Sequence, residues 1–250
     1  MPEVDGVPEL PDLEPFPEDW TRGMAIVAHP DDLEYGGASA IAHFTDQGKE
    51  LTYVLASAGE AGIDGMEPSD CAAVRMEEER RGAARVGVET VEFLDHQDGM
   101  IEYGLELRRD LARMIRRYRP EILITSNHYF TWGGSGLNMA DHRNVGLAAI
   151  DAARDAGNRW VFPELIDEGL EPWRGARRIF VNASPFPTHA VDVTYTIDRG
   201  IASLRAHEAY LAGLGADGMA DPAPFLRGMA EQAGERFGGR LAVTFEFFEW

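Results

Sequence analysis

The sequence predicts an α/β fold, a single domain in which helices cover both faces of a mostly parallel sheet. Short apolar runs typical of buried strands alternate with longer segments whose apolar residues repeat at helical spacing. This alternation of strand and helix is typical of parallel sheets. The 250 residues suffice for one large core, and no internal repeat or clear domain boundary divides them.

The expected elements follow the chain in order. Residues 1–22 are rich in proline and are expected to form an extended arm, so that the domain spans 23–250. Strands are expected at 24–28, 51–56, 91–94, 122–125, 179–181 and 241–248. Helices are expected from 33 to 47 and at 71–85, 107–118, 142–156 and 201–211. The glycine-rich stretch 213–239 is expected to be irregular.

Composition limits the partners and the chemistry. The formal net charge of −20 argues against nucleic acid and an anionic membrane surface as partners. Cys71 is the single cysteine, so a metal would have to be held by His, Asp or Glu. No stretch approaches the roughly 20 apolar residues of a membrane span. Residues 1–20 are acidic and lack the apolar core of a signal peptide, so a cytoplasmic location is expected.

The tetrapeptide His29-Pro30-Asp31-Asp32 directly follows the first expected strand. Ligands of open parallel sheets bind beyond the carboxyl ends of the strands. Histidine and aspartate both suit Zn²⁺, and of two adjacent aspartates one can bind the metal while the other acts as a base. The alternative is an ordinary helix start, with proline in the first turn and carboxylates favoured by the helix dipole.

His142 is the best candidate for a third metal ligand, since catalytic zinc sites keep three protein ligands and one open position. It follows a strand and the segment 127–141, which is rich in glycine and aromatic residues and has no periodicity. Loops of this length are usually functional or disordered. The alternative is an ordinary helix whose N-cap is Asp141.

Together these motifs resemble the PIG-L/LmbE-like family of zinc-dependent N-acetylglucosaminyl deacetylases. The resemblance covers about residues 22–210, and its most specific element is Ala28-His-Pro-Asp-Asp32. Other matching positions are Gly59-Glu60, Arg75 with Glu78, Asp98-Gly99, Asp141-His142, Asp192-Val-Thr194 and Ala206-His207. The resemblance implies a Rossmann-like fold and removal of an acetyl group from an N-acetylglucosamine-type conjugate.

The resemblance also implies roles for individual residues. One Zn²⁺ per chain would be held by His29, Asp32 and His142, with Asp31 as the general base. Residues that would contact the sugar or orient the site are Glu60, Arg75 and Asp98. Trp132, Tyr129 or Phe130 in the long loop could stack on the sugar.

Each supporting position has a plainer interpretation. Arg75 and Glu78 are three residues apart on one helix and could form a surface pair. Asp98-Gly99 could be only a turn, and Glu60 a solvated carboxylate. His207 lies on an apolar helix face and is expected to be structural rather than catalytic.

One position departs from the family pattern. The family usually carries a histidine three residues before the last ligand, thought to stabilise the tetrahedral intermediate, and here that residue is Met139. His189, in a proline-rich loop after the strand that ends near Val181, is the candidate replacement donor. His128 and Asn138 are the reserve candidates.

The predicted activity is therefore metal-assisted hydrolysis of an amide in a small amino-sugar substrate. Two alternatives remain: an amidase for a thiol conjugate or an antibiotic-like glycoside, and a non-catalytic protein that binds metal or sugar. A nucleotide-binding protein is the weakest option, because Gly36-Gly37 is not the expected glycine fingerprint. The aglycone, the use of another divalent metal and homo-oligomer formation stay open.

Overall fold

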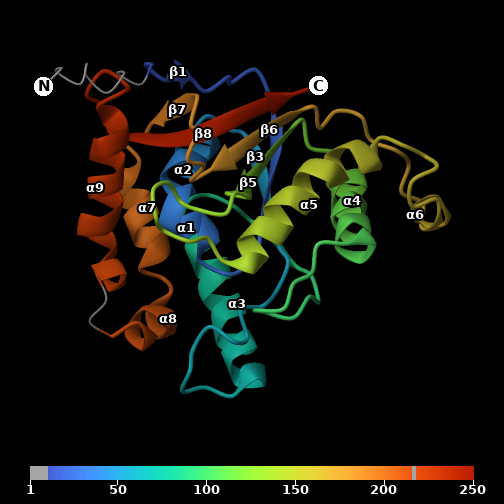
Figure 1. Ribbon diagram of the computed structural model, residues 1–250, viewed down its shortest axis with the longest axis horizontal. Helices are drawn as coiled ribbons and strands as arrows, with labels where there is room; N and C mark the ends of the chain where they lie inside the picture. Colours follow the sequence, from blue (N-terminus) through green and yellow to red (C-terminus); the bar gives the residue numbers. More distant parts are fainter. Residues whose placement is uncertain (1–10, 216–217) are drawn as a thin grey trace, which may run out of the picture.

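The computed structural model describes residues 11–215 and 218–250, and it confirms the predicted α/β fold. One eight-stranded sheet has the order β1-β7-β8-β6-β5-β2-β3-β4 (Figure 1). All neighbouring strands are parallel except β8, which is antiparallel to both β6 and β7. The strands are β1 Glu14–Pro15, β2 Arg22–Val27, β3 Glu50–Leu55, β4 Thr90–Phe93, β5 Ile122–Ser126, β6 Arg178–Asn182, β7 His189–Asp192 and β8 Ala242–Glu249.

Helices cover both faces of the sheet, as expected (Figure 1). α2, α7 and α9 contribute to the core cluster on one face, whereas α4 and α5 pack on each other and on the opposite face. The helices are α1 Asp32–Gly36, α2 Ala38–Asp46, α3 Pro68–Arg85, α4 Leu105–Tyr118, α5 Ala140–Ala156, α6 Glu164–Asp167, α7 Ile197–Leu204, α8 Glu208–Gly213 and α9 Pro222–Gly234, with a 3₁₀ turn at Gly218–Ala220.

Strand β2 explains why the first apolar run is continuous. It lies in the interior of the sheet between β5 and β3. Ala25 and Val27 pack into the core cluster on one face, while Met24 and Ile26 pack into the cluster on the other. A strand covered on both faces needs apolar side chains at every position, so the sequence shows no alternation.

The described part of the N-terminal arm packs onto the sheet. Glu14–Pro15 pairs with β7 at the sheet edge, and residues 1–10 lie outside the described residues. The Phe16 ring stacks on Phe180 at 3.8 Å between centroids, and Trp20 is also buried. These aromatic side chains anchor the segment, since each buries a large apolar surface.

Several predicted helix boundaries need correction. The expected helix over 201–211 is two helices, α7 and α8, separated at residues 205–207. The stretch expected to be irregular contains α9, which begins with Pro222 and buries Leu226 and Ala230. The glycines near both ends of α9 led to the prediction of an irregular segment, although Leu226 and Ala230 lie on one buried face of the helix. Among the described residues, no helix has the length and apolar character needed to cross a membrane.

Candidate active site

The site lies where β2 and β5 end side by side. These strands are parallel neighbours, with Ile26 opposite Thr125. β2 is followed directly by the segment His29–Asp32, and β5 leads through the long loop into α5. Two segments about 110 residues apart in the sequence therefore meet at the carboxyl edge of the sheet, which is where ligands of such sheets bind.

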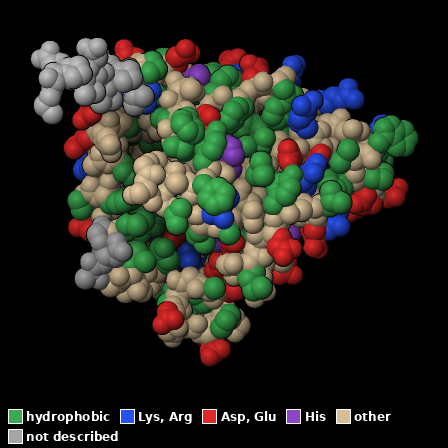
Figure 2. Space-filling view, viewed as in Figure 1, with side chains coloured by type: hydrophobic (Ala, Val, Ile, Leu, Met, Phe, Trp, Pro, Cys, Tyr) green, Lys and Arg blue, Asp and Glu red, His purple; other side chains and the backbone are tan. Residues whose placement is uncertain are grey.

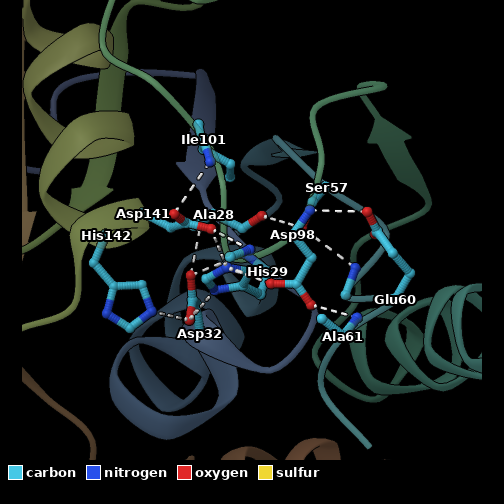
Figure 3. Close-up of polar contacts among 12 residues, drawn as sticks. Ala28, His29, Asp32, Ser57, Glu60, Ala61, Asp98, Ile101, Asp141 and His142 are labelled. Atoms are coloured by element: carbon cyan, nitrogen blue, oxygen red, sulfur yellow. Dashed lines mark hydrogen bonds and ion pairs between the residues drawn. The ribbon is translucent and has the colours of Figure 1, made fainter. Parts of the chain in front are cut away.

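His29, Asp32 and His142 converge there with ligand atoms within 4.8 Å of one another (Figure 3). Asp32 Oδ1 lies 3.0 Å from His142 Nε2 and 3.7 Å from His29 Nδ1. The other carboxylate oxygen of Asp32 accepts the backbone N–H groups of Ala28 and His29, both at 3.0 Å. This leaves Oδ1 facing the two imidazoles.

Partners behind the two histidines fix their ring orientation. His29 Nε2 lies 3.1 Å from Asp98 Oδ1 and 3.1 Å from Asp141 Oδ2. Asn138 donates its amide N–H groups to the carbonyls of Asn127 and Tyr129, so its oxygen is left to accept from His142 Nδ1 at 3.0 Å. His29 Nδ1 and His142 Nε2 are thereby the nitrogens left to bind a metal, the arrangement expected of metal-ligating histidines.

The carboxylates around His29 give this position a surplus of negative charge. Burial lowers the pKa of His29, but Asp141, Asp32 and Asp98 outweigh burial and raise it to about 12. Burial raises the pKa of Asp32, yet the nearby His142 and His29 hold it well below its usual value. Both directions mean that the site stabilises positive charge.

The donor set fits a divalent metal ion. Zn²⁺ bonds to nitrogen and oxygen at about 2.0–2.1 Å, so tetrahedral ligand atoms lie roughly 3.3 Å apart. The spacings of 3.0 and 3.7 Å around Asp32 Oδ1 bracket that value. Two imidazoles and one carboxylate match a catalytic zinc site that keeps an open position.

Asp31 lies between helix α3 and the candidate metal-binding group, which consists of His29, Asp32 and His142. Its backbone is left-handed, with φ of 90°, a conformation that costs about 1–3 kcal/mol in a residue other than glycine. Arg75 contacts its carboxylate at 3.1 Å and also donates to the carbonyl of Pro30. Burial raises the pKa of Asp31 to about 6, against the opposing effect of Arg75. A carboxyl group with a pKa in this range suits general-base catalysis.

Three residues expected to contact the sugar or orient the site lie against other residues of the site. Asp98 holds His29, and its own N–H donates to Glu60 Oε1 at 2.8 Å. Arg75 is buried against Asp31 and does not pair with Glu78, which instead accepts the N–H of Ala209 at 2.6 Å. The surface-pair interpretation of Arg75 and Glu78 is therefore wrong, and contact of Glu60, Arg75 or Asp98 with substrate stays a prediction.

The structure does not bring His189 to the metal-binding group. His189 begins β7, which is separated from β2 by β8, β6 and β5. At about 4.8 Å per strand this separation is roughly 19 Å. Its ring packs against Phe247, and Nδ1 lies 2.9 Å from Thr188 Oγ1. The prediction missed the insertion of β8 between β6 and β7, which moves His189 outward.

The reserve donors also have other partners. Asn138 holds His142, and His128 packs on Tyr129 with ring centroids 4.3 Å apart. Met139, where the family carries histidine, is 44% exposed and is the N-cap residue of α5. Asp141, expected as that N-cap, lies inside the helix. Its carboxylate contacts His29 and accepts the N–H of Gly99 at 2.7 Å.

The loop before α5 carries exposed apolar side chains, among them Phe130, Trp132 and Leu137. Of its aromatic residues, Trp132 lies next to a ligand, with its ring 5.5 Å from that of His142. Phe130 is exposed under Arg143, whereas the hydroxyl of Tyr129 donates to Glu246. In Figure 2 acidic side chains lie mostly toward the edges of the viewed face, and apolar ones are frequent in its centre.

The comparisons with known proteins agree with this geometry. Residues 24–153 match the family model PIG-L, described as GlcNAc-PI de-N-acetylase. The chain is 29% identical over 236 residues to a diacetylchitobiose deacetylase from Thermococcus kodakarensis, covering 94% of this chain and 85% of the relative.

A second relative is a 1D-myo-inositol 2-acetamido-2-deoxy-alpha-D-glucopyranoside deacetylase from Acidothermus cellulolyticus, 26% identical over 238 residues, with 76% of this chain and 80% of the relative covered. Among solved structures, the N,N'-diacetylchitobiose deacetylase from Pyrococcus horikoshii superposes with a TM-score of 0.84 at 26% identity, over 93% of this chain and 85% of that one.

Proposed function

The chain belongs to the PIG-L family, and from this premise we propose that it is a metal-dependent deacetylase acting on an N-acetylated amino sugar. Relatives along nearly the whole chain are named deacetylases of diacetylchitobiose, which makes this chain a hydrolase of N-acetyl amide bonds. The observation that carries the proposal is the convergence of His29, Asp32 and His142 beside the buried Asp31.

Zn²⁺ is the metal we propose, one per chain, since the family is metal-dependent and the donors are two imidazoles and one carboxylate. Such an ion would act as a Lewis acid that polarises the acetyl carbonyl. Asp98, Asp141 and Asn138 would keep the two imidazoles in the ligating tautomer.

Asp31 is the proposed general base. It takes a proton from water as the water oxygen attacks the acetyl carbon, and it returns that proton to the amine nitrogen as the C–N bond breaks. The products are acetate and a free amino sugar. Arg75, 3.1 Å from the carboxylate, fixes its direction and opposes the rise in pKa that burial causes.

The amino sugar would lie under the loop before α5. Trp132 is half exposed beside His142 and offers its ring to the apolar face of a sugar. A thiol-conjugate amide or an antibiotic-like glycoside would use the same chemistry and would differ only in the group beyond this ring.

The proposal is tested by incubating the zinc-loaded protein with N,N'-diacetylchitobiose and N-acetylglucosamine conjugates. Acetate and free amine should appear in equal amounts, and chelation should stop the reaction. Asp31→Asn is the control for contaminating hydrolases. Full metal occupancy with no cleavage of any N-acetyl sugar would instead support the non-catalytic alternative.

A further inference from the structure

Helix α3 holds Asp31 from two sides. Arg75 and Glu79 are four residues apart and therefore lie on one face of the helix. Arg75 contacts the Asp31 carboxylate at 3.1 Å, and Glu79 Oε2 accepts the Asp31 backbone N–H at 3.1 Å. One helical turn thus contacts both the side chain and the backbone of the proposed base.

The hydrogen bond from the Asp31 N–H to Glu79 supports a residue with an unfavourable backbone conformation. Asp31 has a φ of 90°, in the left-handed region that favours glycine. Such a conformation persists only when its surroundings over-determine it. Asp31 is buried, so without Glu79 its N–H would lose its acceptor away from water, and the peptide could rotate to find another.

Glu79 is itself enclosed by a polar cluster that the proposed mechanism does not use. Its neighbours are Glu34 and His207, and the three side chains are at most 1% exposed. His207 Nε2 lies 3.7 Å from Glu79 Oε2 and 3.9 Å from Glu34 Oε2. Ser203 ties Glu34 to the helix α3 backbone, since its hydroxyl lies 3.0 Å from Glu34 Oε1 and 2.8 Å from the Gly82 carbonyl.

We propose that Glu79 is a positioning residue, which holds Asp31 in its left-handed conformation and is itself buried beside Glu34 and His207. The inference rests on the proposed function, since it gives Glu79 a purpose only if Asp31 is the base. It extends that function to a residue outside the proposed metal ligands and the proposed base.

The cluster could instead bind a second metal ion. Its three ligand atoms lie within 4.8 Å of one another. In the described part of the chain, Glu34 Oε2, Glu79 Oε1 and both ring nitrogens of His207 meet no hydrogen-bond partner. However, His207 Nδ1 lacks the acceptor that a metal-ligating imidazole normally has. The missing acceptor favours the positioning role, and metal content tests the alternative.

The test compares Glu79→Leu, Glu79→Gln and the control Glu77→Leu, each with zinc bound. Leucine fills a similar volume but cannot accept the Asp31 N–H, whereas the glutamine oxygen can. Displacement of a catalytic group by about 1 Å costs on the order of 10²-fold in rate. Glu79→Leu should therefore lower kcat by about that factor with KM and metal content unchanged, and Glu79→Gln should keep most of the activity. Glu77 is exposed on the same helix, so Glu77→Leu should match the wild type.

Hydrogen exchange of the Asp31 amide, followed by NMR, gives a readout that does not depend on activity. The amide should be protected in the wild type and in Glu79→Gln, and it should exchange faster in Glu79→Leu. An inactive wild type with this exchange pattern would refute the proposed function but support the positioning of Asp31.

Three results would overturn the proposal. Glu79→Leu could fold and keep a normal kcat. Glu79→Gln could lose kcat by about 10²-fold, although its side-chain oxygen can still accept the Asp31 N–H. This variant alone tests the positioning role if Glu79→Leu does not fold. The wild type could also hold a second equivalent of metal that disappears in His207→Gln, which would make the cluster a metal site.

Discussion

Asp141 Oδ2 lies 3.1 Å from His29 Nε2, the ring nitrogen that does not face Asp32 (Figure 3). The same carboxylate accepts the N–H groups of Gly99 at 2.7 Å and Ile101 at 3.2 Å. Asp141 therefore connects helix α5 and the loop after β4 to the ligand that follows β2. If His29 binds a metal as proposed, Asp141 acts on that metal through the imidazole.

Asp141→Asn should weaken metal binding without removing a ligand. An amide is a poorer acceptor than a carboxylate and can present an N–H to His29, so the ligating tautomer loses support. Loss of such a partner typically lowers metal affinity by about 10–100-fold. Competition with a chelator of known affinity measures the change. Asp151→Asn, on the same helix but bonded to Tyr103, is the control and should bind like the wild type.

Replacing His29, Asp32 or His142 by alanine should lower metal content sharply. The three ligand atoms lie within 4.8 Å of one another, and each removal leaves only two donors. Metal analysis of the purified variants, with circular dichroism to check the fold, measures this. Full occupancy in all three variants would contradict the assignment of the site.

Asp31→Asn should keep the metal and the fold but lose turnover. The amide cannot take a proton from water, and removal of a general base typically costs about 10²–10⁴-fold. Steady-state acetate release per bound metal is the measurement. A variant with a near-normal rate would move the base elsewhere, and Glu60 would be the next residue to replace.

The convergence of His29, Asp32 and His142 was predictable because of where strands end. A continuous apolar run marks β2 as a buried strand, so the polar residues after it lie at the carboxyl edge of the sheet. The same argument placed His142 after β5 and its loop. The family resemblance then indicated which of these polar residues to propose as metal ligands.

The supporting contacts could not be predicted in the same way. Glu79 is one of three consecutive glutamates on α3, and nothing in that run shows that Glu78 and Glu79 turn inward or that Glu79 reaches Asp31. The expected position of His189 near the site was wrong for another reason. The order of strands in a sheet depends on tertiary pairing, and β8 lies between β6 and β7 although it follows both in the sequence. Local sequence contains no signal for that insertion.

Met139→His should raise turnover. Met139 lies three residues before His142, is exposed at the start of α5, and cannot donate a hydrogen bond to an oxyanion. Losing one such donor commonly costs about 10²–10³-fold, so regaining it should recover part of that factor in kcat. Metal content should not change. Met229→His, on α9, is the control, and an equal rate in wild type and Met139→His would show that another group already supplies the donor.

His207→Gln should make the protein less sensitive to acid. Burial, together with the nearby positive charges of Arg75 and Arg81, lowers the pKa of His207 from 6.5 to about 3. In the unfolded chain the imidazole of His207 is therefore protonated below about pH 6.5, whereas in the folded protein it is protonated only below about pH 3. The stabilisation due to the neutral imidazole is complete above pH 6.5 and is lost as the pH falls from there toward 3.

Between pH 6.5 and 4.5 the wild type should lose about 2 kcal/mol more of its free energy of unfolding than His207→Gln. Urea denaturation at several pH values in this range measures the difference. Burial raises the pKa of Glu34 to about 8, which favours the folded state as the pH falls from 8 toward 4.5, but this effect is present in both proteins. Equal slopes in the two proteins would mean that His207 is already protonated when folded. It would then pair as a cation with Glu34 and Glu79, 3.9 and 3.7 Å away.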